Sequence, residues 1–317
     1  MWQEIQAELL RQEIETLIAP LSNIFGFRDL IKEPLTKARR GLAPNIMHDR
    51  PWALIPLMVC EALCGHYKHA IPAGAALQFF LAAGDVFDDI EDADCSDSLS
   101  AKYGSAVATN AATTLLMLAE KAITRLKERG VADLVTVCIM NVVNSYYIKA
   151  CTGQHLDLKF NSEIAGSEDI YFQVTDMKSA SQIECACKVG ALLARAKREL
   201  VDLFVQFGHN LGISSQIAND IQGIINGSDI SKNPNTLPVI YALNQTDNQI
   251  CNELRHIFSK PSEIVLDIEK VRDLLFRTGA IHYATIKMEY YKQQARAILS
   301  KAEAAGANIE RLKLLLD

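Results

Sequence analysis

Residues 77–92 read LQFFLAAGDVFDDIED, an apolar run that ends in a cluster of carboxylates. On a helix, Asp88 and Asp92 would share a face one turn apart, with Asp89 beside them. Burying this much negative charge against an apolar wall is costly unless a cation neutralises it. Carboxylate oxygens favour hard cations such as Mg²⁺, which usually bridge to substrate phosphates. The stretch therefore predicts a metal-bound diphosphate above an apolar shaft; the alternative is an exposed acidic helix end, since acidic residues continue to Asp97.

The remainder of the chain continues the helical pattern. With 317 residues, 49% of them apolar, it is long enough for a large core, and no alternating β pattern recurs. Helices are expected at about 2–20, 51–65, 71–91, 105–129, 131–157, 168–194, 197–225, 236–244, 247–258, 264–278 and 280–304. No repeat or linker separates them, so we predict a single all-α domain over residues 1–317.

Charge and cysteine content exclude several classes of protein. The net charge of −6 and the lack of a basic stripe argue against a nucleic-acid partner. The N-terminus is charged and amphipathic, and no uncharged apolar run reaches about 18 residues, so we expect a cytoplasmic protein without a transmembrane segment. The eight cysteines form no CxxC pair or zinc spacing. We interpret them, including Cys60 and Cys64 at i, i+4, as reduced packing residues rather than metal or redox groups.

The acidic stretch resembles the first aspartate-rich motif, DDxxD, of the trans-isoprenyl diphosphate synthases, the polyprenyl synthetase family. Further motifs of that family follow in its order over most of the chain. They are Arg50-Pro51, Gly153-Gln154-His155-Leu156-Asp157, Tyr171 with Lys178-Ser179, Gly190-Ala191-Leu192-Leu193, Gln216-Ile217-Ala218-Asn219-Asp220, and Asp229 with Thr236-Leu237-Pro238-Val239-Ile240-Tyr241. The order and spacing together carry the resemblance, because no single motif is decisive.

The resemblance implies a helical bundle of the isoprenoid-synthase type around a deep central cavity, assembled as a homodimer. It implies a prenyl diphosphate held through three Mg²⁺ ions between two acidic motifs. Asp88, Asp89 and Asp92 would bind two of the ions. Asn219 and Asp220 would bind the third, with the asparagine using its carbonyl oxygen.

The same resemblance assigns catalytic roles beyond the metal ligands. Lys178 would steady the diphosphate as a point charge, beside Asp88 and Asp92. Gln154 and Asp157 would face the site one turn below. Taken alone, Lys178 is better explained as a solvated helix lysine, and only its register with the other motifs assigns it to the site. Asp157 is equally consistent with the C-terminal region of a helix.

Small residues one turn before the acidic motif predict a long substrate tail. Ala83 and Gly84 would let the tail run toward Phe80, about 12 Å along the helix axis from Asp88. We therefore expect a C15 or C20 diphosphate to be preferred over C10. The alternative is that both residues are small so that a neighbouring helix can pack closely. Phe87, Arg50, Lys178 and Asp229 complete the expected substrate-binding set.

Several departures from the family pattern affect the second substrate. A chain-elongating synthase holds isopentenyl diphosphate with cationic groups, but the expected lysine is Met47 and the expected histidine is Leu81. No arginine pair follows Asp94. The second acidic motif is reduced to Asn219-Asp220-Ile221-Gln222-Gly223, and its following loop is short. Because an unpaired second diphosphate would be costly, we expect ordinary chain elongation to be lost.

This pattern most resembles the ComQ-type branch of the family, whose members transfer a prenyl group to the tryptophan of a small pheromone peptide. We therefore expect an isoprenyl transferase whose acceptor is not isopentenyl diphosphate and is a small peptide in the leading interpretation. A class I terpene synthase on the same fold and a chain-elongating synthase stay open as alternatives. A non-catalytic partner subunit is a third alternative, which the intact Asp88, Asp89 and Asp92 argue against because such a subunit needs no metal site.

Overall fold

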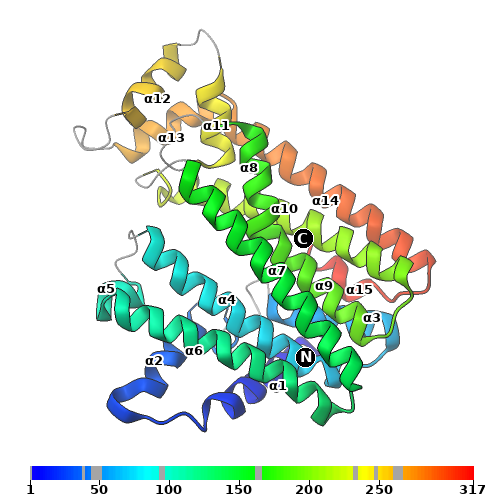
Figure 1. The fold of residues 1–317 in the computed structure, drawn as a ribbon. Coiled ribbons are helices and arrows are strands. Elements are labelled where there is room, and N and C mark those ends of the chain that lie inside the picture. The colour runs from blue at the N-terminus through cyan, green and yellow to red at the C-terminus, as the bar shows by residue number, and fades with distance from the viewer. Residues whose placement is uncertain are drawn as a thin grey trace.

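The computed structural model describes residues 2–37, 40–43, 52–92, 97–160, 166–230, 235–245, 249–259 and 267–317. These residues fold into helices without a strand (Figure 1), which confirms the all-α prediction. The α-helices are α1 (Trp2–Ile18), α2 (Phe27–Thr36), α3 (Ile55–Cys64), α4 (Ile71–Asp92), α5 (Leu99–Tyr103), α6 (Ser105–Thr124), α7 (Asp133–Phe160), α8 (Glu168–Val174), α9 (Ser181–Leu193), α10 (Arg198–Asn226), α11 (Leu237–Asn244), α12 (Gln249–Ser259), α13 (Ile268–Arg277), α14 (Ala280–Ala304) and α15 (Glu310–Lys313). Short 3₁₀ turns are η1 (Ile24–Gly26), η2 (Trp52–Leu54), η3 (Lys68–Ala70) and η4 (Arg125–Arg129), and η5 (Thr175–Ala180) is a π-helix.

Helix α4 is the central helix of the bundle. It packs against α6 along its length and also contacts α1, α2 and α3. Phe79, Ala82 and Ala83 on this helix are fully buried, as expected for a helix that is apolar around most of its circumference. This packing fixes the position of the acidic residues at its C-terminal end.

Helices α7, α9 and α10 form the other side of the bundle. Helix α9 packs between α7 and α10, and α10 packs in turn against α14. Helices α8, η5 and α9 form one continuous helical stretch, as the sequence predicts for 168–194, but its middle is a π-turn. Wide turns of this kind are rare in proteins overall, and those that occur often lie at functional sites.

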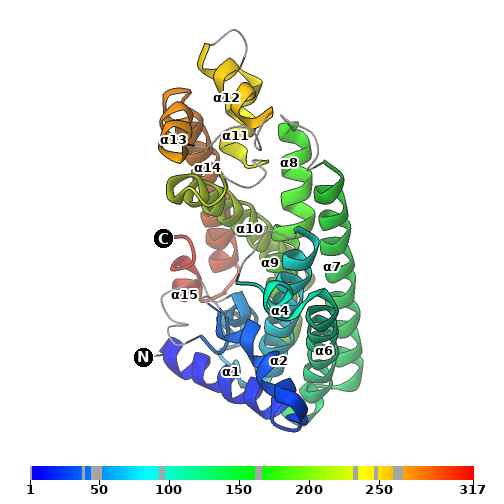
Figure 2. The same cartoon turned by 90° about the vertical axis from the view of Figure 1, so that its left-hand side faces the viewer.

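A smaller apolar cluster lies at the end of the bundle away from α1 (Figure 2). It joins α11, α12 and α13 to the ends of α10 and α14, through residues such as Val239, Leu254 and Leu274. The N- and C-termini lie on the same side of the bundle in this view. The single-domain expectation stays a prediction.

Two helical stretches are long and apolar enough to cross a membrane by length and composition alone, Lys68–Glu91 and Asp133–Phe160. In the first, 78% of the apolar window is buried, because it is the central helix of the bundle. In the second, which is α7, only 22% is buried, so much of its apolar surface faces outward.

The main difference from the expected helices lies in α2. No helix is expected between residues 20 and 51, because Gly26 and Pro34 interrupt the pattern. The structure places Pro34 near the C-terminal end of the helix, while Ile31 and Leu35 are buried on one face. Burial of this face outweighs the lost backbone hydrogen bond.

Candidate active site

A cavity of about 470 Å³ opens between α4, α7, η5 and α9. Its volume lies in the range of small-molecule sites. Most of its walls are apolar, while a few polar and charged side chains gather at the C-terminal end of α4. The lining residues are Trp52, Leu77, Phe80, Leu81, Gly84, Asp85, Phe87, Asp88, Glu91, Leu116, Val143, Tyr146, Tyr147, Ala150, Cys151, Gln154, His155, Leu158, Lys178, Gln182, Ile183, Cys185 and Ala186.

Helix α4 presents one face to this cavity. Phe80, Gly84, Phe87, Asp88 and Glu91 all line it and recur at the three- and four-residue spacing of one helix side. The structure therefore brings the expected Phe80, Gly84, Phe87 and Asp88 into one site. A Cβ added at Gly84 would meet nothing within 4 Å, so this position leaves open space in the cavity.

Lys178 is the charged centre of the polar end. Its Nζ lies 3.1 Å from Asp88 Oδ2 and 3.1 Å from Asp157 Oδ2, so one ammonium bridges carboxylates from α4 and α7. Desolvation lowers the pKa of Lys178, but Asp88 and Asp157 outweigh it and raise the pKa above its ordinary value. The lysine is therefore a fixed positive charge.

Gly153 explains how Lys178 reaches this position. A Cβ added at Gly153 would lie only 2.6 Å from the backbone nitrogen of Lys178, closer than real side chains allow. The glycine lets α7 touch the backbone of the π-helix η5. The glycine of the Gly-Gln motif is thus required for close packing of α7 on η5. This packing brings Asp157 and Lys178 together.

Gln154 lines the same cavity. Its Nε2 donates a hydrogen bond of 2.9 Å to Glu91 Oε2, which joins α7 to the end of α4. Its Oε1 is buried with no hydrogen-bond partner among the residues that the structure describes. A buried acceptor of this kind needs a donor from elsewhere, such as a ligand or a metal-bound water.

These groups fit Mg²⁺. The carboxylate of Asp88 is 38% exposed at the end of the cavity, Asp157 Oδ2 lies 3.1 Å from Lys178 Nζ, and Gln154 lines the cavity with them. Hard oxygen ligands with room for water are what Mg²⁺ selects. Lys178 now neutralises Asp88 and Asp157, and a bound cation would take over part of that role.

Asp220 of the second acidic motif lies in a different environment. It is 4% exposed and accepts hydrogen bonds from Tyr171 Oη at 2.7 Å, Gln216 Nε2 at 2.9 Å and Leu237 N at 3.1 Å. Burial raises its pKa to about 6, although these donors favour the ionised form. In this structure Asp220 ties α10 to α8 and to the start of α11.

Gly223 stands at the last position of the second acidic motif, and the carboxylate of Asp229 lies against it. A Cβ added at Gly223 would lie 1.9 Å from Asp229 Oδ2, so the glycine is required where the loop carboxylate folds back. The backbone nitrogen of Asp229 donates to Gly223 O at 3.3 Å, and Ser228 Oγ donates to Asp229 Oδ1 at 3.0 Å. A carboxylate is therefore present near this position, contributed by the loop and not by the helix.

Some expected residues lie elsewhere. The expectation for Ala83 is wrong: it is fully buried in the core and does not line the cavity, because it is rotated by about 100° from Gly84 around the helix. Asp89 turns away from the cavity and pairs with Lys37 at 3.3 Å. Asn219 is exposed on α10 and, like Asp229, does not line the cavity.

Two further expectations concern positions that the structure does not describe. Arg50 lies outside the described residues. Asp92 ends α4, but its side chain lies outside them too. Their roles in substrate and metal binding stay predictions.

The sequence interpretation missed several cavity residues on α7. The ring of Tyr147 lies 4.9 Å from that of Phe80, and Tyr147 and Cys151 precede Gln154 on the same face of α7. This i, i+4, i+7 spacing was visible in the sequence and would have identified them. The pair between Arg40 and Asp85 at the polar end joins segments 45 residues apart and had no such signal.

Comparisons with known proteins agree with this geometry. Residues 50–275, more than two-thirds of the chain, match the family model described as polyprenyl synthetase. The chain is 29% identical over 280 residues to the geranylfarnesyl diphosphate synthase of Aeropyrum pernix, covering 83% of this chain and 87% of that protein. It is 28% identical over 249 residues to the tryptophan prenyltransferase ComQ of Bacillus subtilis (strain 168), covering 77% and 78%.

Solved structures show the same fold. The geranylgeranyl pyrophosphate synthetase of Pyrococcus horikoshii superposes with a TM-score of 0.81 at 23% identity, covering 98% of this chain and 95% of that one. A polyprenyl synthetase of Streptomyces coelicolor A3(2) gives 0.82 at 17% identity, covering 99% and 96%. Both likenesses bear on the architecture alone and confirm the expected type of helical bundle.

Proposed function

The chain belongs to the polyprenyl synthetase family of prenyltransferases, and from this premise we propose that it transfers an all-trans prenyl group of C15 to C20 to an acceptor other than isopentenyl diphosphate. Members of this family generally depend on Mg²⁺. The proposal goes beyond family membership in naming the length of the tail and the class of acceptor.

One observation carries the proposal: Lys178 bridges Asp88 and Asp157 at the polar end of an otherwise apolar cavity. The diphosphate of the substrate would meet the ammonium of Lys178 at this end, and its hydrocarbon tail would lie along the apolar face of α4. When bound, Mg²⁺ supplies Lewis-acid stabilisation of the departing diphosphate. The apolar walls would exclude water from the allylic cation that remains.

The depth of the cavity supports a long tail. Leu77 lines the cavity eleven residues before Asp88, which corresponds to about 16 Å along the axis of α4. Each isoprene unit has four carbon–carbon bonds of about 1.5 Å and adds about 5 Å of extended length. A C10 tail would leave the end at Leu77 empty, whereas a C15 tail would come within about 2 Å of it and a C20 tail would reach it.

The residues around the end of α4 support an acceptor without a diphosphate. Leu81 lines the cavity where the family pattern has a histidine. Lys37 and Arg40 reach α4, but each is paired with a carboxylate, on Asp89 and Asp85 respectively. The likeness to ComQ suggests that the acceptor is a small tryptophan-containing peptide.

Chain elongation is the second candidate. The likeness to a geranylfarnesyl diphosphate synthase favours it as strongly as the likeness to ComQ favours peptide transfer. The two candidates share the ionisation step, so they differ only in what attacks the prenyl cation.

A product assay separates these candidates. The protein is incubated with Mg²⁺ and C10, C15 or C20 diphosphate, alone, with isopentenyl diphosphate, or with a tryptophan-containing peptide. We expect diphosphate release from C15 and C20 without any longer prenyl diphosphate, and a mass increase of the peptide by one prenyl group. A longer diphosphate would establish elongation, and a hydrocarbon or alcohol formed without any acceptor would establish terpene synthesis. No turnover of any substrate would contradict the transferase proposal.

We also propose that the protein is a cytoplasmic homodimer formed through α6 and α7. Leu134, Val137 and Ile148 on α7 are 82%, 61% and 66% exposed, and Met117 on the adjacent α6 is 60% exposed. Outward-facing apolar side chains along a helix indicate a covered surface. Ile148→Glu should convert the dimer to monomer in sedimentation velocity, whereas Ile286→Glu on α14 should not, although Ile286 is 69% exposed. A dimer that survives Ile148→Glu would place the interface elsewhere.

A further inference from the structure

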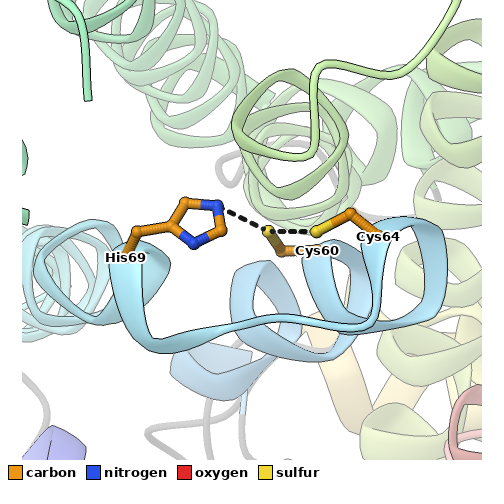
Figure 3. A group of neighbouring side chains, drawn as sticks. All are labelled: Cys60, Cys64 and His69. Atoms are coloured by element: carbon orange, nitrogen blue, oxygen red, sulfur yellow. Dashed lines mark hydrogen bonds between the residues drawn. The ribbon is translucent and has the colours of Figure 1, made fainter. Parts of the chain in front are cut away.

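Two thiols and an imidazole meet at the end of α3, at the start of the connection to α4. Cys60 and Cys64 lie one turn apart on the same face of α3. The chain then reverses at Gly65, whose φ of +75° is a conformation that glycine adopts readily. The 3₁₀ turn η3 follows and carries His69 back toward the two sulfurs (Figure 3).

The distances between these groups suit a tetrahedral metal ion. The two Sγ atoms are 3.8 Å apart, and His69 Nε2 lies 3.2 Å from Cys60 Sγ. All three ligand atoms lie within 4.8 Å of one another. Two zinc–thiolate bonds of about 2.3 Å at a tetrahedral angle place their sulfurs about 3.8 Å apart. The imidazole would need to move back by only a few tenths of an ångström.

We propose that Cys60, Cys64 and His69 form a second metal site, which takes Zn²⁺ and is separate from the acidic residues of the cavity. Thiolate and imidazole ligands select zinc, whereas carboxylate and amide oxygens select magnesium. The two sites would therefore bind their ions without competing for them. The site also revises the interpretation of Cys60 and Cys64 as packing residues, because His69 completes a ligand set that cysteine spacing alone did not show.

Backbone oxygens surround the three side chains and leave a place for a fourth ligand. His69 Nε2 lies 3.2 Å from Leu193 O, and Cys64 Sγ lies 3.3 Å from His66 O. One of these carbonyls or a water molecule would complete the tetrahedron. Cys60 is buried, but Cys64 and His69 are partly exposed, so an ion has a path from solvent.

The position of the site indicates a structural role. His69 lies two residues before the start of α4, and Leu193 ends α9, so a bound ion would connect α3, α4 and α9. Asp88 is 17 residues from the start of α4, about 25 Å along its axis. Zinc at this position would stabilise the bundle without touching the substrate.

The test uses the reduced, metal-stripped full-length protein in excess Mg²⁺. It is titrated with ZnCl₂, and with CoCl₂ as a spectroscopic probe of the ligand type. We expect one equivalent of Zn²⁺, a sulfur-to-cobalt charge-transfer band, and a higher melting temperature with zinc. Cys64→Ser and His69→Ala should each weaken zinc binding by about 100-fold or more, because each removes a ligand.

Matched variants keep the test decisive. Cys138→Ser, at an exposed cysteine on α7, should bind zinc as the unaltered protein does. Cys64 and His69 are the altered positions because Cys60 is buried and its loss could prevent folding. Unchanged zinc binding in Cys64→Ser and His69→Ala would overturn the proposal, as would a folded protein that binds no zinc. Binding lost only in His209→Gln would overturn it too, and would assign the ion to the cluster of Asp176, Glu184 and His209.

Discussion

Asp88 and Asp220 belong to the two acidic motifs, yet the structure gives them opposite surroundings. Asp88 is 38% exposed at the end of a cavity and shares one lysine with Asp157. Asp220 is 4% exposed and accepts hydrogen bonds from Tyr171, Gln216 and Leu237. A carboxylate of the first kind can exchange its partner for a metal ion, while one of the second kind would first have to give up three donors.

These opposite surroundings show that a motif match does not fix the role of its residues. Ser179 Oγ donates to Gln216 Oε1 at 2.8 Å, and Gln216 continues to Asp220, so the second motif is joined by hydrogen bonds to the residue next to Lys178. Such networks hold an arrangement in place when every member is satisfied. We infer that the second motif supports the position of Lys178, whereas metal binding by Asp220 stays a prediction.

The largest expected effect is at Asp88. Asp88→Asn should lower diphosphate release by about 10³-fold, since it removes charged ligation where the leaving group departs. Stability should change little, because the side chain is partly exposed and Lys178 keeps Asp157. Release is measured with C15 diphosphate, and unfolding with denaturant. Asp97→Asn is the matched control, because Asp97 is 81% exposed and pairs with Lys102 outside the cavity. Full activity in Asp88→Asn would remove the metal role from the first motif.

At Asp220 the effect should fall on stability. Asp220→Ala should lower the free energy of unfolding by about 3 kcal/mol, because it leaves three donors, two of them buried, without their acceptor. The measurement is denaturant unfolding, with Gln222→Ala as control, since Gln222 is exposed on the same helix and bonds only locally to Asn226. A stable Asp220→Ala variant as inactive as Asp88→Asn would show that the two motifs have equivalent roles.

Neighbouring positions on α4 should separate substrate contact from packing. Gly84→Phe should shift preference from C15 toward C10 diphosphate by about tenfold, because it fills open space next to the tail. Ala83→Phe should instead destabilise the protein by about 1 to 3 kcal/mol and leave relative preference unchanged, because Ala83 is fully buried in the core. Competition between C10 and C15 substrates, together with thermal unfolding, checks both. If Gly84→Phe and Ala83→Phe change the preference between C10 and C15 equally, α4 is rotated about its axis relative to this structure.

The smallest effect should come from His209, which lies on α10 with Asp220. Hydrogen bonds to Asp176 and Glu184 raise the pKa of His209 from 6.5 to about 9. The stabilisation is therefore complete below pH 6.5 and is lost as the pH rises through about 9. Because the side chain is 35% exposed, screening reduces the contribution to about 1 kcal/mol.

Unfolding measured at pH 6 and pH 9.5 checks this expectation. His209→Gln should remove most of the difference in unfolding free energy between the two pH values. His282→Gln, at an exposed histidine on α14, should leave the difference unchanged. If His209→Gln keeps the full pH dependence, another group is responsible for it.

The long helices could be predicted from the sequence because their apolar periodicity is strong. The expected helix at 71–91 corresponds to α4 at Ile71–Asp92, and the one at 280–304 to α14 at Ala280–Ala304. Helix α2 and the π-turn η5 could not be predicted in this way. The first contains Pro34, and the second depends on packing against α7 at Gly153.

Some features of the candidate site could also be predicted from the sequence, and others could not. Asp88, Gln154 and Lys178 meet as the motif order implied, because the first two lie on the long helices α4 and α7 and Lys178 lies in the continuous helical stretch from α8 to α9. The burial of Asp220 could not be foreseen, since it depends on Tyr171, 49 residues earlier in the chain. Ala83 and Gly84 are adjacent in sequence, but only the helix rotation set by packing against α6 shows which one meets the cavity.

The wide turn at Thr175–Ala180 also affects how this chain should be aligned with its relatives. A π-turn holds one residue more than the α-turn it replaces, so the side chains after it are rotated by about 100° relative to an uninterrupted helix. An ungapped alignment with a relative whose helix is uninterrupted here would pair residues on different faces of α9. The number of residues between Tyr171 and α9 therefore determines which face of α9 each following side chain occupies.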